Sequence, residues 1–172
     1  MFAIVKLIQS LLGALHSEGT PGQLALGITL GSIMGLTPLV NLHNAVVFAL
    51  IVLLNVSFAG GLLGWAVFVP VGFLLDPLFD WIGHQLLFAE SLRAMWTSFY
   101  NTPIIPLTNF NNTVVLGSLV FALLFFVPLF FVTRWAVTRY RATIGERVRQ
   151  SRWYRALTAS KLYNVYRLFK PQ

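Results

Sequence analysis

The stretch covering residues 19–44 constrains the fold of this chain most, because it is apolar, contains no Asp, Glu, Lys or Arg, and carries glycines at a helical spacing. Gly27, Gly31 and Gly35 recur every four residues, so on a helix they form one face without side chains. The backbone of another helix can approach such a face closely. We therefore predict that these three glycines, with Pro38 at the end of the segment, mediate helix packing or contact with a partner protein.

The composition sets the class of protein. Hydrophobic residues make up 57% of the chain and charged residues only 10%, whereas soluble domains carry about 25% charged residues. We therefore predict an all-α, multi-pass helical bundle in a membrane, built as a single domain of 172 residues. The absence of cysteine excludes disulfides, thiolate catalysis and Cys-based metal sites.

The positive charge is concentrated in the last part of the chain, where ten of the twelve Lys and Arg residues lie between Arg134 and Lys170. Because basic loops stay in the cytoplasm, this asymmetry predicts a membrane protein with a cytoplasmic C-terminus. The tail over residues 134–172 also has an aromatic helical face, which favours an anionic lipid surface over nucleic acid. The predicted contacts with anionic headgroups are Arg141, Arg147, Arg149, Arg152, Arg155, Lys161 and Arg167.

Apolar runs and helix signals divide the chain into segments. Asn55 is a predicted N-cap that splits a long apolar run into a short piece, 45–54, and a longer one, 56–75, as in a re-entrant hairpin. Asp76 followed by Pro77 predicts the start of another helix. The predicted segments are an amphipathic helix at 1–17, glycine-rich helices and a hairpin at 22–75, an amphipathic helix at 77–100, and a transmembrane helix at 114–133.

Four polar residues lie at the predicted membrane depth: Asn41, His43, Asn44 and Asn55. Polar side chains in hydrocarbon are costly unless they are paired. They therefore indicate either turns whose hydrogen bonds are satisfied or a polar site for a lipid headgroup or a partner. In the second case, His43 and Asn55 are the residues we expect to matter most.

Asp76, Asp80 and His84 are spaced so that they share one helical face. This spacing permits a metal or proton site, but it is more typical of a solvated helix face that begins with an N-cap. The chain has no phosphate-binding glycine loop, no nucleophile elbow and no His-Glu-x-x-His motif. We therefore predict a non-enzymatic protein without a metal or cofactor.

The motif Pro21-x3-Ala25-x-Gly27-x3-Gly31-x3-Gly35-x2-Pro38, followed by His43 and Asn55, resembles a family of small bacterial inner-membrane proteins catalogued only as a domain of unknown function. The resemblance covers about residues 17–75. It implies a membrane location and a compact, partly re-entrant helical fold, and it implies no reaction. Members often carry an Asn-Pro pair in the second half of the domain, where this chain has Val69-Pro70.

Three functional hypotheses follow from these features. The first is a non-enzymatic membrane subunit that anchors or gates an envelope protein partner, with envelope lipid transport as its context. The second is a small transporter or channel with a polar site at the re-entrant hairpin. The third, a lipid-modifying enzyme that uses Asp76, Asp80 and His84, ranks last.

Overall fold

The computed structural model describes residues 19–145, and all regular structure within this range is helical, as the composition predicts. The amphipathic helix expected at 1–17 and the chain after residue 145 lie outside the described residues. The α-helices are α2 (Pro21–Leu36), α3 (Leu42–Leu53), α4 (Phe58–Leu87), α5 (Arg93–Tyr100) and α6 (Thr113–Tyr140). Two short 3-10 helices, η1 (Glu90–Leu92) and η2 (Ile105–Thr108), flank α5, and the π-helical η3 (Arg141–Gly145) follows α6.

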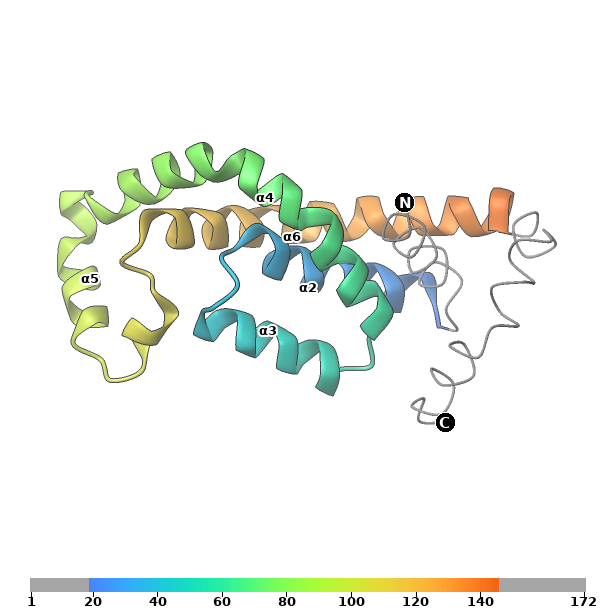
Figure 1. Ribbon diagram of the computed structural model, residues 1–172, viewed down its shortest axis with the longest axis horizontal. Helices are drawn as coiled ribbons and strands as arrows, with labels where there is room; N and C mark the ends of the chain where they lie inside the picture. The colour runs from blue at the N-terminus through green and yellow to red at the C-terminus, as the bar shows by residue number, and fades with distance from the viewer. Residues whose placement is uncertain (1–18, 146–172) are drawn as a thin grey trace, which may run out of the picture.

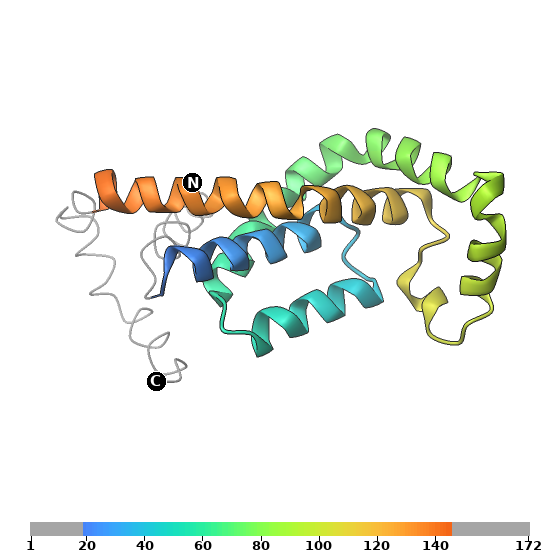
Figure 2. The ribbon, with the colours of Figure 1, turned by 180° about the vertical axis from the view of Figure 1, so that it is seen from behind.

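Helices α2 and α4 both pack along α6 (Figures 1 and 2). The C-terminal half of α6 lies beside α2, where Val137 packs with Leu24 and Ile28. Its N-terminal half packs against the end of α4. We call the end of the bundle that carries Arg139 and Arg141 the basic end; there the Arg141 side chain donates a 2.7 Å hydrogen bond to the carbonyl of Gly19.

Helix α2 lies in the middle of the bundle and is buried on all sides from Leu24 to Leu36, apart from partial exposure of two residues. Its start is a capping box: the Gln23 amide N–H donates to the Thr20 hydroxyl (3.2 Å) and the Thr20 N–H donates to the Gln23 side chain (2.8 Å). Its end comes at Thr37, whose backbone is extended, as expected for a residue before proline.

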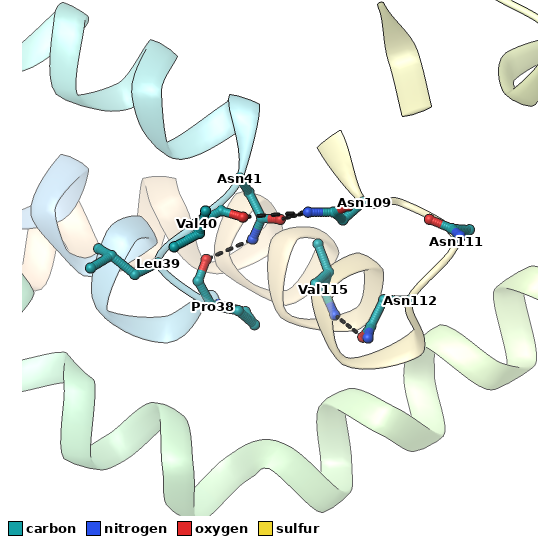
Figure 3. Close-up of a pocket in the computed structure, with 8 residues that line it drawn as sticks. All are labelled: Pro38, Leu39, Val40, Asn41, Asn109, Asn111, Asn112 and Val115. Atoms are coloured by element: carbon teal, nitrogen blue, oxygen red, sulfur yellow. Dashed lines mark hydrogen bonds between the residues drawn. The ribbon is translucent and has the colours of Figure 1, made fainter. Parts of the chain in front are cut away.

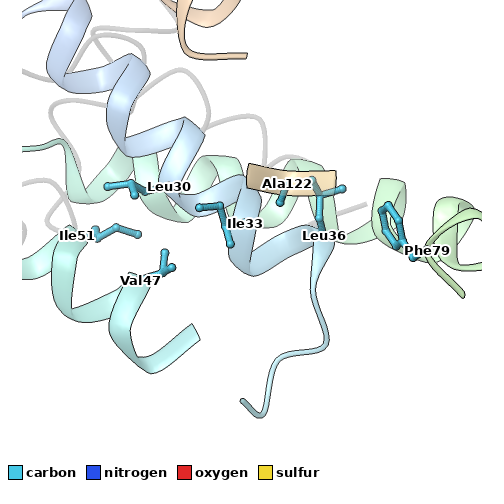
Figure 4. Packing of buried hydrophobic residues seen from close by; sticks show 7 residues of the cluster. All are labelled: Leu30, Ile33, Leu36, Val47, Ile51, Phe79 and Ala122. Atoms are coloured by element: carbon cyan, nitrogen blue, oxygen red, sulfur yellow. The ribbon is translucent and has the colours of Figure 1, made fainter. Parts of the chain in front are cut away.

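The hydrophobic core gathers around α2 (Figure 4). Leu30, Ile33 and Leu36 project from α2 toward α3, α4 and α6. Helix α3 packs mainly on α2 rather than on α4, so the helices on either side of Asn55 share α2 as their neighbour. The remaining buried members of this core are Val47 and Ile51 from α3, Phe79 from α4 and Ala122 from α6.

The prediction that a new helix begins at Asp76-Pro77 is wrong, because α4 continues through both residues and through Pro70. Each proline removes one backbone hydrogen bond and favours a bend, and α4 curves over the bundle in Figure 1. Contacts on both sides of Pro77 hold the helix together: Gly72 lies against α2, and Phe79 is fully buried beside α6. Tertiary packing thus outweighs a local start signal.

The predicted amphipathic helix over residues 77–100 is divided into the end of α4, η1 and α5. The chain reverses after Leu87 because Trp96 of α5 folds back: its indole N–H donates to the carbonyl of Leu86 (2.8 Å) and its ring stacks on Phe110 with centroids 5.7 Å apart. This aromatic contact joins α5 to the loop before α6. Long-range contacts of this kind are invisible to helical periodicity.

Two described helices are long and apolar enough to cross a membrane, Phe58–Leu87 and Thr113–Thr143. The second includes the predicted segment 114–133 but continues through Pro128 and past Arg134. Helices α2 and α3 are shorter, with 16 and 12 residues. The bundle therefore combines two long apolar helices with two short ones.

Candidate functional site

The groove formed by Gly27, Gly31 and Gly35 is filled by α4 of the same chain. A β-carbon added at Gly35 would lie 2.7 Å from the carbonyl oxygen of Trp65, and one at Gly27 or Gly31 would collide with the α4 backbone even more closely. Of the two roles predicted for these glycines, the structure places them in helix packing within the chain. A partner helix could use this groove only by displacing α4.

Helix α4 contributes glycines of its own to this contact. A β-carbon at Gly60 would lie 2.8 Å from the carbonyl oxygen of Leu24, and one at Gly72 would lie 2.7 Å from that of Gly35. Farther along, α4 contacts α6: Gly83 of α4 lies against the backbone of Thr113, and Gly117 of α6 lies against the backbone of Phe79. These residues were not predicted from the sequence, although the glycine spacing at 60, 61 and 64 was a usable signal.

The structure separates the four polar residues that the sequence placed at membrane depth. Asn41, His43 and Asn44 lie at the turn between α2 and α3, whereas Asn55 follows the other end of α3. At that other end, the backbone N–H of Ser57 donates to the carbonyl of Gln23 at the start of α2 (3.1 Å). Asn55 also does not cap α4, because the Ser57 side chain accepts the hydrogen bond from Gly60 N–H (3.1 Å).

Asn44 is buried and its side chain closes the α2–α3 turn. Its side-chain oxygen accepts a hydrogen bond from the Thr37 hydroxyl (2.9 Å), and its amide group donates to the carbonyls of Pro38 (2.9 Å) and Leu39 (3.3 Å). All three of these hydrogen bonds lie within the turn. Asn44 therefore has the structural role that is one of the two predicted alternatives.

A second set of amides joins this turn to the loop before α6 (Figure 3). The Asn41 amide donates to the Pro38 carbonyl (2.6 Å), and the Asn109 amide donates to the Asn41 side-chain oxygen (2.6 Å) and the Val40 carbonyl (3.3 Å). Asn109 adopts a left-handed conformation (φ 56°), which Asn tolerates better than most residues. We call this end of the bundle the amide end.

The amide end contains an open pocket of about 500 Å³ between the α2–α3 turn and the start of α6 (Figure 3). The asparagines of the loop before α6 were not predicted as site residues from the sequence. Their number was the available signal, but the partner turn lies about 70 positions away along the chain. The lining residues are Pro38, Leu39, Val40, Asn41, Asn109, Asn111, Asn112 and Val115.

His43 lies beside this turn, on the first turn of α3 and outside the two long apolar helices. Burial lowers the pKa of its imidazole, and the backbone of Thr108 opposes this shift. Neither ring nitrogen has a hydrogen-bond partner of good geometry within residues 19–145. The His43 ring therefore packs in the turn without a hydrogen bond of good geometry to the described residues.

Asp76, Asp80 and His84 do not form a metal site with one another, because the described residues contain no group of three metal-binding side chains. The Asp80 carboxylate accepts a hydrogen bond from the Thr113 hydroxyl, which joins α4 to the start of α6. The His84 ring lies against Phe88, with ring centroids 4.4 Å apart. These contacts give Asp80 and His84 structural partners.

Of the seven basic residues predicted to contact anionic lipid, only Arg141 falls in the described part of the chain. It lies in η3 and reaches the start of α2. Together with Arg134 and Arg139 it gives the basic end its charge. The other six are outside the described residues.

Comparisons with known proteins address the family. A family model described as "Uncharacterized protein conserved in bacteria (DUF2062)" matches residues 6–144. An "Uncharacterized protein" of Treponema pallidum (strain Nichols) is 26% identical over 117 residues, covering 68% of this chain and 72% of that protein. No solved structure matches. Because the family model spans most of the chain, this protein belongs to the bacterial DUF2062 family, in agreement with the resemblance to a domain of unknown function.

Proposed function

We propose that this protein is a non-enzymatic, multi-pass subunit of the bacterial inner membrane that holds an envelope protein partner, in a complex that moves lipid. Because the glycine groove is occupied by α4, the partner contacts a different surface. The observation that carries this proposal is the outer face of α3, which is apolar and exposed in a helix too short to cross a bilayer. The partner it fits is an apolar membrane helix.

Helix α3 is too short to cross a bilayer. Its 12 residues span about 18 Å, whereas the hydrocarbon core is about 30 Å thick. Its exposed side chains include Val46 (53%), Val52 (56%) and Leu53 (80%), which require an apolar neighbour. A short apolar segment in a membrane thins the bilayer, extends basic side chains to the surface, or associates with other helices. Helix α3 has no Lys or Arg, which leaves thinning or association.

The proposed orientation places the basic end in the cytoplasm. Both α2 and α3 have one end there: α2 begins beside Arg141, and the residues after α3 contact the start of α2. The two helices therefore form a re-entrant pair that enters from the cytoplasmic side and turns at residues 37–41. The exposed face of α3 then lies in the cytoplasmic leaflet, where a partner helix can cover it.

The transporter hypothesis finds less support. It proposes a polar, water-accessible site at the hairpin around Asn55, with His43 as the second residue, but the length of α3 separates these two residues. Asn55 is exposed in the turn at the basic end. Asn55 therefore does not mark a polar path through the bundle.

Photo-crosslinking tests the proposal on the full chain, which lacks cysteine and so accepts single labels. Val52→Cys on α3 and Val127→Cys on α6 have matched exposure, 56% and 58%, and each would carry a benzophenone maleimide. We expect the Val52 label to give one adduct with an identified membrane-helix peptide of a protein that also co-purifies in equal amount. The Val127 label should give mainly lipid adducts.

Two results would contradict this proposal. Lipid adducts alone at both positions would mean that α3 faces the bilayer without a partner. An adduct between two copies of this chain would mean that the surface is used for self-association. Lipids retained with an identified complex, measured by mass spectrometry, would show whether lipid transport is its context.

A further inference from the structure

We propose that the pocket at the amide end binds a neutral polyhydroxyl group, such as the sugar headgroup of a membrane lipid. The inference rests on the side chains around the pocket and does not depend on a protein partner. It concerns the end of the bundle opposite to the basic end, so it is independent of the α3 surface. Three features of the described residues carry it: spare hydrogen-bonding groups, a lining without charged side chains, and an apolar lip.

The pocket has more amide groups than its own structure uses. The Asn109 amide group donates to the Val40 carbonyl and to the Asn41 side-chain oxygen, and the Asn41 amide group donates to the Pro38 carbonyl. The Asn109 side-chain oxygen remains available. The Asn112 oxygen accepts from Val115 N–H (3.1 Å), which leaves its amide group to donate. Asn111 is exposed and engages none of its amide groups within residues 19–145. The free groups thus include both donors and acceptors.

The charges around the pocket favour a neutral ligand. None of the described residues that line it is charged. Proteins recognise phosphate and carboxylate groups most strongly with Arg or Lys. A helix N-terminus also attracts anions, but the start of α6 has the Asp80 carboxylate bonded to Thr113 beside it. A hydroxyl group, which both donates and accepts, matches the free amides without needing a counter-charge.

The pocket also has an apolar part beside its amides. Leu39 and Val40 are exposed at 55% and 87% and form a lip beside the amides. The C–H face of a sugar can pack on such a lip while its hydroxyls reach Asn111 and Asn112. The volume of about 500 Å³ is within the range of small-molecule sites.

Lipid retention measured by native mass spectrometry tests this site. The full-length protein is placed in nanodiscs that contain equal amounts of monoglucosyl diacylglycerol, phosphatidylcholine and phosphatidic acid with identical acyl chains. We expect the glucosyl lipid to be retained about fivefold over phosphatidylcholine, as one net hydrogen bond of about 1 kcal/mol would give. The variant Asn111→Leu should remove most of this preference without unfolding the protein, because Asn111 makes no internal hydrogen bond in the described residues.

Asn101→Leu is the matched control, since Asn101 is an exposed asparagine of the same loop region that does not line the pocket. It should keep the wild-type preference. Equal retention of all three lipids, a preference for phosphatidic acid, or equal loss in both variants would overturn the proposal. Competition with methyl glucoside separates two sources of the same chemistry: displacement indicates a soluble sugar ligand, and persistence indicates a lipid headgroup.

Discussion

Helix α2 and the turn that follows it contact the rest of the protein in different ways. Along most of its length, α2 meets α4 backbone to backbone through glycines on both helices. At the turn after α2, the contact with the loop before α6 is made by asparagine side chains. Glycine contacts leave no space and no free polar group, whereas amide contacts leave donors and acceptors exposed. The first kind of contact supports stability, and the second offers capacity for binding.

The exposed fraction of the side chains also differs between α2 and the pocket. Residues of α2 such as Leu24 and Ala25 are almost fully buried, at 1% and 0%, whereas Val40 at the pocket lip is exposed at 87%. A mutation in the glycine contact should therefore act on folding, and a mutation at the pocket should act on binding. The variant Asn111→Leu tests binding at the pocket, and the substitutions at Gly31, Asn44 and Ser57 test stability, from the largest expected effect to the smallest.

Gly31→Ala should have the largest effect, because its β-carbon would collide with the Gly61 carbonyl and lie 2.9 Å from the Trp65 amide nitrogen. Both are backbone atoms of α4 and cannot move without separating the helices. We expect a loss of about 3 kcal/mol or more in the free energy of unfolding. Reversible unfolding in mixed micelles with increasing SDS would measure it.

Gly22→Ala provides the matched control in the same helix. Its added β-carbon would lie 3.7 Å from the Thr20 hydroxyl oxygen, an ordinary contact, so its stability should match or slightly exceed the wild type. Equal stability of the Gly31 and Gly22 variants would show that the α2–α4 contact is not close-packed.

Asn44→Ala should have the next largest effect, because it is a buried amide that holds the α2–α3 turn. The substitution leaves the carbonyls of Pro38 and Leu39 without this donor and removes one of the two acceptors near the Thr37 hydroxyl. We expect a loss of about 2 kcal/mol. The same unfolding measurement applies, with Asn101→Ala as an exposed control that should change stability little. A neutral Asn44 variant would mean that the glycine contact alone positions the turn.

The smallest effect is expected at the start of α4. Ser57→Ala removes the side chain that accepts from Gly60 N–H and should cost about 1 kcal/mol. Asn55→Ala, at the position that the sequence favoured as the cap, should leave the stability within about 0.5 kcal/mol of the wild type. The reverse order of the two variants would restore Asn55 as the helix cap.

Only those parts of the candidate site that are local in the chain could be predicted from the sequence. The chain-local features were accessible: the polar turn after α2 was visible from Pro38, Asn41 and Asn44. Which loop meets that turn was not, because Asn109 reaches it across 68 positions of the chain. The role of Asn55 was misjudged because a nearby serine with better geometry caps the helix instead.

By itself, the sequence determined that the described chain is helical and apolar and that α2 carries a face for close packing. These properties depend on composition and on spacing within a single helix. Only the tertiary structure decided that α4 fills the groove, that α4 continues through Pro77, and that the asparagine loop meets the α2–α3 turn. The physical reason is that each of these outcomes depends on contacts between distant segments, whose packing energy exceeds the local preference of a proline or a cap.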